Sequence, residues 1–200
     1  MLAAGALGAG VAWGLHTWRD GSNADEALRK ARWMEDVMFG RAEIGGPFTL
    51  TDTQGKRRSL EDFRGRIVLL YFGYTYCPDV CPTDLMQIAE VLARLGPKAD
   101  QVQPLFVTFD PERDTPKHLQ SYLEDFDRRL IGLTGTADEL ARVAKSWRVH
   151  YAKVPMADGN YLIDHSAYTF LIDQQGRYGG VFPPGTEAQR MLGPIMSMLR

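Results

Sequence analysis

Cysteine is scarce in this sequence, and an excess of charge of either sign is missing. Only two cysteines occur among 200 residues, which excludes a small domain held together by several disulfide bonds. Lysine and arginine total 23 against 25 aspartates and glutamates, a formal net charge of −2. Nucleic-acid-binding proteins carry a strong basic excess, so we expect no nucleic-acid partner. Hydrophobic residues at 44% and charged residues at 24% are ordinary globular values, which exclude a disordered, collagenous or coiled-coil chain.

The one long run without charge lies at the N-terminus. Residues 1–18 contain no charged side chain, and the first charge is that of Arg19. The segment is rich in alanine and glycine, and its length is near the lower limit for a helix that spans a bilayer, about 17 residues. Trp13 and Trp18 stand near its end, where amphipathic rings favour the headgroup level. We interpret the segment as a membrane anchor; a cleaved signal peptide and a buried helix of the domain are the alternatives.

The residues that follow predict a helical tether. Apolar side chains recur at helical spacing over residues 23–39. Gly40 and the run Gly45-Gly46-Pro47 then end the pattern. A tether of this kind would connect an apolar segment to a globular domain.

Length and pattern together divide the chain into three parts. We expect an anchor or signal segment at residues 1–18, a tether at 19–42 and one globular domain at 43–200, because about 150–200 residues suffice for a single core. Five basic residues fall between Arg19 and Arg41. By the positive-inside rule these residues would hold the domain in the cytoplasm. We do not take the charge count alone to settle the orientation.

Strands and helices alternate in the domain. The run IVLLYF at residues 67–72 has strand length and no polar face, which predicts a central strand covered on both sides. Apolar periodicity, capping residues and turn residues predict the other elements. We expect a helical turn at 59–63, strands at 48–51, 102–109, 168–172 and 178–182, and helices at 83–95, 116–126, 136–147 and 186–199.

This order of elements predicts a thioredoxin-like α/β fold. A strand, a helix and a parallel strand, followed by an antiparallel hairpin and a last helix, form a central mixed sheet flanked by helices. An N-terminal apolar segment precedes the fold. The charged loop Asp110–Asp114, after the second inner strand, is expected to be a solvated turn, with contact to a partner as the alternative.

Both cysteines lie in one short motif. Cys77-Pro-Asp-Val-Cys81 follows the buried strand and opens the next helix. If this loop is helical, the spacing places both sulfurs on one face, and the start of a helix favours the thiolate over the thiol. The pair can form a redox-active disulfide or chelate a soft metal ion. The simpler alternative is a structural disulfide or two buried thiols.

The other possible ligands narrow the choice of metal. Two sulfurs are too few for a structural zinc site, and the chain has no further cysteine. Two thiolates with one imidazole suit copper, either Cu(I) in a low-coordinate site or Cu(II) with an added oxygen ligand. His165 stands directly before a predicted inner strand, whose start should face Cys77 and Cys81. We therefore take these three residues as the candidate metal ligands. The remaining histidines are interpreted as solvent-facing or structural: His16, His118 and His150.

The chain resembles the Sco/SenC family. The resemblance rests on four separated segments in order: YFGYTYCPDVCPTDL, VTFDPERDTP, FDRRLIGLTGT and DHSAYTFLID. It covers roughly residues 43–199, nearly all of the globular part. A Cys-x-x-x-Cys pair alone is a weak signal, whereas the ordered set is specific. Tyr76 departs from many members, which have a histidine there, but that histidine is not a required ligand.

The resemblance implies a copper chaperone that assists cytochrome c oxidase assembly. By position, Cys77 and Cys81 match the family's two thiolate ligands and its redox pair, and His165 matches its imidazole ligand. Asp79 and Asp164 match neighbouring acidic positions, which we expect to support the ligands without binding the metal.

The family also implies a location. Its members are usually tethered by one N-terminal helix and face the periplasm or the mitochondrial intermembrane space. No arginine- and serine-rich transit peptide precedes the domain. We therefore expect a protein of the bacterial inner membrane, anchored at its N-terminus, with the domain in the periplasm. We expect a monomer.

Two functions follow from these residues. In the first, a metallochaperone takes copper from a donor, holds it through Cys77, Cys81 and His165, and passes it to the binuclear copper centre of oxidase subunit II. In the alternative, a thiol–disulfide oxidoreductase uses Cys77 and Cys81 as catalytic residues, with Cys77 as the attacking thiolate, to reduce cysteines of the oxidase subunit or another redox partner. His165 separates the two functions, because only the first requires it.

A peroxidase of the peroxiredoxin type is a third possibility, since such enzymes share the fold. They carry a Pro-x-x-x-Thr-x-x-Cys run. In this chain the corresponding positions before Cys77 hold Leu70 and Tyr74. The absence of that pattern argues against peroxide chemistry.

Overall fold

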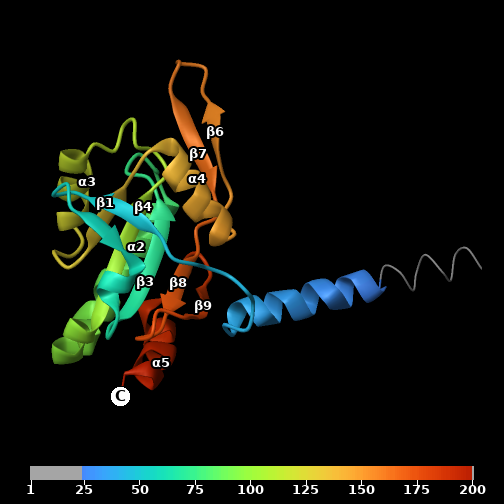
Figure 1. Ribbon diagram of the computed structural model, residues 1–200. Helices are drawn as coiled ribbons and strands as arrows, with labels where there is room; N and C mark the ends of the chain where they lie inside the picture. The colour runs from blue at the N-terminus through green and yellow to red at the C-terminus, as the bar shows by residue number, and fades with distance from the viewer. Residues whose placement is uncertain (1–23, 200) are drawn as a thin grey trace, which may run out of the picture.

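Seven strands form one mixed sheet in the order β2-β1-β5-β4-β3-β8-β9 (Figure 1). The computed structural model describes residues 24–199. The parallel strands are β3, β4 and β5, and the remaining strands are antiparallel to their neighbours. This is the central mixed sheet that the sequence predicted. The strands are β1 (Thr49–Asp52), β2 (Arg57–Ser59), β3 (Ile67–Gly73), β4 (Val102–Thr108), β5 (Ile131–Thr134), β8 (Thr169–Ile172) and β9 (Tyr178–Phe182).

The strand predicted to be central is central. Every residue of β3 is buried, as is every residue of its parallel neighbour β4. Successive side chains point to opposite faces of a sheet. Tyr71 accordingly packs near Phe106, with ring centroids 6.0 Å apart, while Phe72 packs near Trp147 at 6.4 Å. Both faces of β3 are therefore covered, which its uninterrupted apolar sequence requires.

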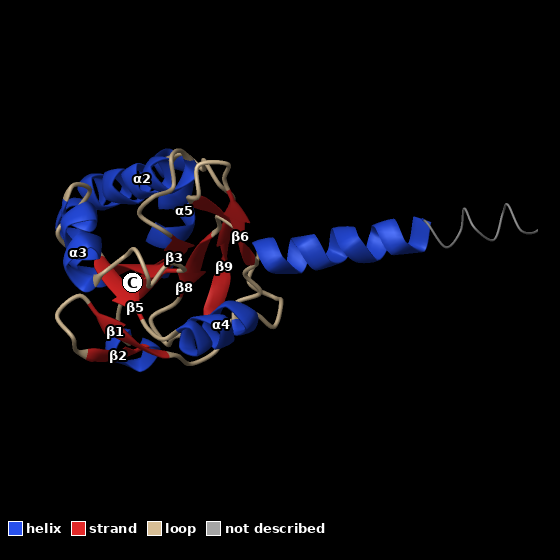
Figure 2. Ribbon diagram, turned by 90° about the horizontal axis from the view of Figure 1, so that it is seen from above, coloured by secondary structure: helices blue, strands red, loops and turns tan. Residues whose placement is uncertain are grey.

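Helices cover both faces of the sheet. In Figure 2, α2, α3 and α5 lie on one face and α4 lies on the other. Thr115 and Thr136 cap α3 and α4, because each side chain accepts a backbone N–H from the first turn. The two caps confirm the predicted helix starts. The helices are α2 (Val80–Leu95), α3 (Pro116–Glu124), α4 (Ala137–Ser146) and α5 (Ala188–Met198), with short 3-10 segments η1 (Leu60–Phe63) and η2 (Gly96–Gln101).

Residues 24–38 form a helix that extends away from the sheet (Figure 1). The hydroxyl of Tyr178 donates a hydrogen bond to the carbonyl of Val37 and so attaches the end of this helix to β9. Over residues 24–199, no helix has both the length and the apolar character needed to cross a membrane. The expected anchor at residues 1–18 lies outside the described residues.

Several elements were not predicted. β2 and β5 are only three and four residues long, too short to show alternation. A separate two-stranded sheet, β6 (Tyr151–Pro155) and β7 (Tyr161–His165), was also missed. Most of its side chains are exposed or half-buried, so no apolar run marks it. Helix α2 begins at Val80, three residues before the predicted start.

We predict that Gly132→Ala destabilises the fold. A β-carbon at this position of β5 would lie 2.7 Å from Cγ of Leu119 and 2.8 Å from Cδ1 of Leu123 in α3. Overpacking of this kind costs about 1–3 kcal/mol, measured as the free energy of unfolding in urea. The double variant Gly132→Ala/Leu119→Ala should lose less stability than the sum of the two single variants, because Leu119→Ala makes room for the new methyl group. Strict additivity would contradict the steric explanation.

Candidate metal centre

Residues 74–79 join the end of β3 to the start of α2 and carry Cys77. Cys81 lies in the first turn of α2. The sulfur of Cys81 packs against the end of β3, at Gly73. A β-carbon at residue 73 would lie 2.8 Å from this sulfur, which is closer than real contacts allow. The absence of a side chain at Gly73 therefore makes room for the thiol.

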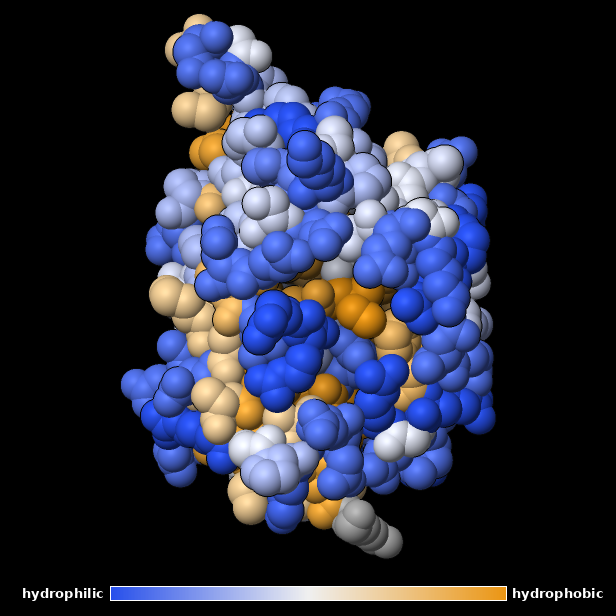
Figure 3. Space-filling view, turned by 90° about the vertical axis from the view of Figure 1, so that its left-hand side faces the viewer, coloured by the Kyte–Doolittle hydropathy of each residue, from blue (hydrophilic) through white to orange (hydrophobic). Residues whose placement is uncertain are grey.

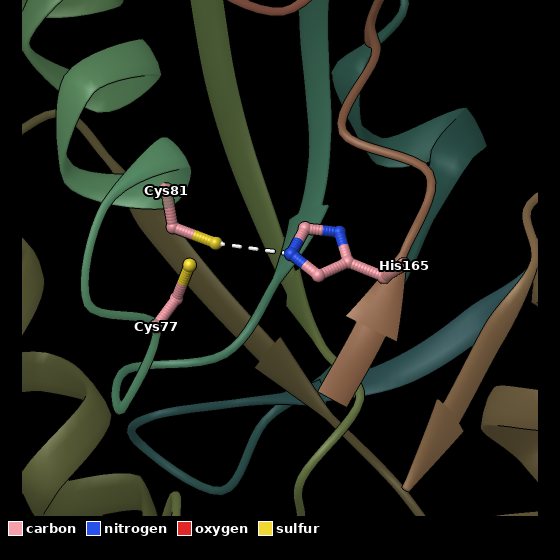
Figure 4. Close-up of side chains that lie close together, drawn as sticks. All are labelled: Cys77, Cys81 and His165. Carbon is pink, nitrogen blue, oxygen red and sulfur yellow. Dashed lines mark hydrogen bonds between the residues drawn. The ribbon is translucent and has the colours of Figure 1, made fainter. Parts of the chain in front are cut away.

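His165 reaches the two sulfurs from the end of β7 (Figure 4). One ligand atom from each of Cys77, Cys81 and His165 lies within 4.8 Å of the others. Nε2 of His165 is 3.3 Å from Sγ of Cys81. Nδ1 is 3.3 Å from the carbonyl oxygen of Ser166. When a metal occupies the site, a hydrogen on Nδ1 would donate to this carbonyl and leave the lone pair of Nε2 for the metal.

Two aromatic rings flank the imidazole. Tyr74 lies edge-on to His165 with ring centroids 5.8 Å apart, and Phe109 lies at 6.0 Å. Both rings are buried. They restrict the orientation of the imidazole and keep water from that side of it.

The two thiols differ strongly in acidity. Cys77 is half-buried and Cys81 is fully buried. The hydrogen bond from the Cys81 thiol lowers the pKa of Cys77 to about 3; burial opposes this effect, and His165 and backbone N–H groups add to it. The same hydrogen bond, followed by burial, raises the pKa of Cys81 far above its ordinary value. At neutral pH the reduced pair therefore carries a thiolate on Cys77 and a proton on Cys81.

A buried carboxylate holds the cysteine loop in place. Asp114 has no exposed surface. Its carboxylate accepts hydrogen bonds from the backbone N–H of Thr75 at 3.1 Å, from the hydroxyl of Thr75 at 2.6 Å and from the hydroxyl of Thr108 at 2.5 Å. Burial raises the pKa of Asp114, and the hydrogen bonds oppose that rise. The loop before Cys77 is thereby attached to the end of β4.

Two further polar groups are buried close to Cys81. The hydroxyl of Tyr71 and Oδ2 of Asp84 have no hydrogen-bond partner within residues 24–199. Burial raises the pKa of both groups. Oδ1 of Asp84 accepts the backbone N–H of Gly185 at 2.7 Å, which ties α2 to the segment before α5. The buried thiol therefore has polar neighbours on the side away from solvent.

The structure brings together the three side chains proposed as ligands. The two acidic residues expected to support them behave differently. Asp79 precedes the first turn of α2 and is exposed. Asp164 is also exposed and, one residue before His165 in β7, points to the opposite side of the strand. Neither carboxylate forms a hydrogen bond to the three side chains in the part of the chain that the structure describes.

The expectation of a solvated turn at Asp110–Asp114 was wrong. Asp110 and Asp114 are both fully buried. Arg113 forms an ion pair with Asp110, and both carboxylates accept hydrogen bonds from hydroxyls far away in the sequence, those of Thr75 and Tyr161. A run of charged residues gives no indication of such distant partners. Only the resemblance of the segment VTFDPERDTP to the Sco/SenC family marked this loop as more than a connection.

The other histidines occupy different places. Nε2 of His118 lies 2.9 Å from Oγ1 of Thr75, and its ring lies 5.4 Å from that of Tyr76. It is thus exposed but in contact with the cysteine loop, which the sequence did not indicate. His150 is exposed, and its backbone pairs with Ser166. His16 lies outside the described residues.

We predict selective alkylation of Cys77 in the reduced protein. The thiolate is the reactive form, and the depressed pKa of Cys77 keeps it ionised between about pH 5 and 8. The rate of modification by iodoacetamide, followed by peptide mass spectrometry, should therefore stay nearly constant over this range, while Cys81 is left unmodified. In Cys81→Ala the hydrogen-bond donor to the thiolate is removed, which raises the pKa of Cys77, so the rate should fall toward the acid end. A rate for wild type that rises tenfold per pH unit would contradict the assignment.

Known proteins resemble this chain over most of the described fold. A mitochondrial SCO2 homologue of Bos taurus is 41% identical over 159 residues, which are 78% of this chain and 60% of the relative. The chain thus spans about 60% of the length of that relative. A SCO2-like protein of Rickettsia prowazekii is 42% identical over 145 residues, 72% of this chain and 71% of the relative.

The solved structures give the same result. Bradyrhizobium japonicum ScoI with copper bound matches with a TM-score of 0.73 at 44% identity, over 78% of this chain and 99% of that chain. The resemblance to the Sco/SenC family, seen first in separated sequence segments, is thereby confirmed. Residues 37–200 match the sequence model of SCO1/SenC, and the chain belongs to that family.

Proposed function

We propose that this protein binds copper through Cys77, Cys81 and His165 and delivers it during the assembly of cytochrome c oxidase. The observation that carries the proposal is the convergence of two sulfurs and one imidazole nitrogen within 4.8 Å. This donor set suits copper better than zinc, which would lack a fourth protein ligand. The Bradyrhizobium relative holds copper, and the Sco family is one of oxidase assembly proteins.

Copper binding requires a defined protonation state of the site. Thiolates and a neutral imidazole bind the metal. Cys77 is already ionised at neutral pH, whereas Cys81 still holds a proton. Loading with Cu(I) therefore releases about one proton from Cys81. Oxidation of the pair to a disulfide removes both thiolates and abolishes binding.

Unequal exposure of the sulfurs suits a site that gives its metal away. Cys77 is half-buried, whereas Cys81 is enclosed. An acceptor's thiolate would approach the metal beside the half-buried Cys77 and His165 and not beside Cys81, and of the two thiolates it would replace Cys77 first. The acceptor that we propose is the binuclear copper centre of oxidase subunit II, supplied by a separate copper donor.

A second candidate function follows from the acidity difference. The thiolate of Cys77 can attack a target disulfide and form a mixed disulfide, releasing one target thiolate. Cys81 then loses its proton and attacks Cys77, which releases the second target thiolate and leaves a Cys77–Cys81 disulfide. The two electrons pass from the pair to the target. Such a reductase could prepare the acceptor's cysteines for copper, and it does not need His165.

The arrangement in the cell is part of the proposal. Residues 1–18 anchor the chain in a bacterial inner membrane, residues 19–42 form the tether, and residues 43–200 work in the periplasm as a monomer. The uncharged N-terminal run and the helix at 24–38 that extends from the domain support this arrangement. The resemblance to tethered members of the family supports it as well.

The copper site is tested by an anaerobic Cu(I) titration of the reduced full chain in mild detergent, against a competing chelator. Wild type should bind one equivalent. Binding should be lost in Cys77→Ser/Cys81→Ser. In His165→Ala the affinity should fall at least about tenfold, about 1.4 kcal/mol, because one of three ligands is missing.

A matched histidine controls for general effects. His150 is exposed, so His150→Ala should bind copper like wild type. If His165→Ala also binds like wild type, the three-ligand site is wrong. If wild type fails to compete for copper but rapidly reduces a small-molecule disulfide, the reductase is the better description.

A further inference from the structure

The strand that carries His165 is not part of the main sheet. β6 and β7 pair only with each other among the described strands. The tip of this hairpin stands clear of the body at the top of the molecule (Figures 1 and 3). Backbone hydrogen bonds of the seven-stranded sheet therefore do not fix the imidazole relative to the cysteines. The short connection from His165 to Thr169 of β8 restrains the end of the hairpin, and side-chain contacts restrain the rest of it.

Several of these contacts involve Arg113, in the loop between β4 and α3. Its guanidinium carbon lies 3.7 Å from the centroid of the Tyr161 ring, at the start of β7. Nη1 donates to the carbonyl of Tyr161 at 2.9 Å. Nε donates to the carboxylate of Asp110, and the hydroxyl of Tyr161 donates to the same carboxylate at 2.7 Å. Arg113, Asp110 and Tyr161 thus form a closed cycle of contacts.

The same loop contacts the hairpin a second time. The ring of Phe109 stacks on that of Tyr151 in β6, with centroids 4.4 Å apart and planes 4° from parallel. Tyr151 is the register partner of His165. The backbone N–H of Phe109 donates to the carbonyl of Gly73 at 2.9 Å, the last residue of β3. The hairpin is therefore connected, through one loop, to the strand that leads to the cysteines.

Arg113 also reaches the cysteine loop itself. Its guanidinium carbon lies 4.7 Å from the centroid of Tyr76, the residue before Cys77. The next residue, Asp114, accepts both hydrogen bonds from Thr75. The planar cation of Arg113 thus contacts an aromatic ring from each half of the site, as guanidinium groups do favourably.

An ordinary surface ion pair does not account for this arrangement. Asp110 has no exposed surface, and the side chain of Arg113 is 22% exposed. Surface pairs are screened and contribute little. Here one buried carboxylate and one cation link three chain segments: the loop, the hairpin and the residues before Cys77. A lysine in place of Arg113 would keep the charge but lose the planar, multiply bonded geometry.

We propose that Arg113, held by Asp110, is a positioning residue that sets the distance between the imidazole of His165 and the thiols of Cys77 and Cys81. The proposal rests on the proposed copper site. Without the contacts of Arg113, the hairpin would sample positions in which the third ligand does not reach the metal. The thiol of Cys81, which α2 positions, would be unaffected, and the loop that carries Cys77 would lose the contact between Arg113 and Tyr76.

The test is a double-mutant cycle on the reduced full chain. Arg113→Lys should weaken Cu(I) binding about 10–100-fold, the range for residues that orient a metal ligand. In the His165→Ala background the same substitution should cause no further loss, because the ligand that it positions is already gone. Asp110→Asn should act in the same direction as Arg113→Lys.

A second measurement needs no metal. In the apo protein, Arg113→Lys should speed hydrogen exchange of the β6 and β7 amides about tenfold while β3 and β4 stay protected. Arg58→Lys is the matched control. Arg58 forms a half-buried pair with Asp52 at the β2 edge of the main sheet. This variant should change neither copper affinity nor exchange in the hairpin.

The outcomes are distinct. Unchanged exchange in the hairpin, or an equal loss of affinity with and without His165, would overturn the positioning role. Faster exchange with unchanged copper affinity would overturn it too, since the hairpin would then move without consequence for the site. If wild type binds no copper, the proposed function fails, and the exchange data alone decide whether Arg113 holds the hairpin.

Discussion

The chemistry of this site depends on one proton that two sulfur atoms share. Cys77 lies in the loop before α2 and Cys81 in its first turn, and the enclosed sulfur of Cys81 cannot readily ionise beside an existing thiolate. The half-buried sulfur of Cys77 therefore carries the charge, and the buried sulfur of Cys81 carries the proton. This asymmetry makes Cys77 the group that meets partners, whether the partner supplies a metal or a disulfide. It also makes the protonation of Cys81 the step that links either reaction to pH.

The third ligand comes from an element with no strand pairing to the rest of the fold. The loop between β4 and α3 contacts both the cysteine loop and the hairpin that carries His165. Asp114 holds the residues before Cys77, and Arg113 with Asp110 holds the hairpin. Burial of these charged groups would be costly without partners, and each carboxylate has several. Charged side chains of this loop thus hold the hairpin and the cysteine loop, whereas backbone hydrogen bonds hold the strands of the main sheet.

The sequence was informative where the causes are local. The apolar run of β3, the Cys-x-x-x-Cys spacing and the caps at Thr115 and Thr136 each depend on residues close together in the chain, and the structure shows all of them. The placement of His165 needed the fold and the family resemblance as well. The role of the loop could not be predicted, because Arg113 meets Tyr161 48 residues later and Asp114 meets Thr75 39 residues earlier. The order of charged residues along the chain does not indicate such distant contacts.

The absence of a side chain at Gly73 also affects which part of the site can change shape. The sulfur of Cys81 is packed against the end of a central strand, in space that even a methyl group would fill. The side chain of Cys81 has no exposed surface, and the hydrogen bond between Asp84 and Gly185 attaches α2 to the segment before α5. A rearrangement that brings the sulfurs into bonding distance or separates them is therefore expected mainly in the six residues between β3 and α2. When the pair is oxidised or reduced, Cys81 therefore stays in place and the loop that carries Cys77 moves.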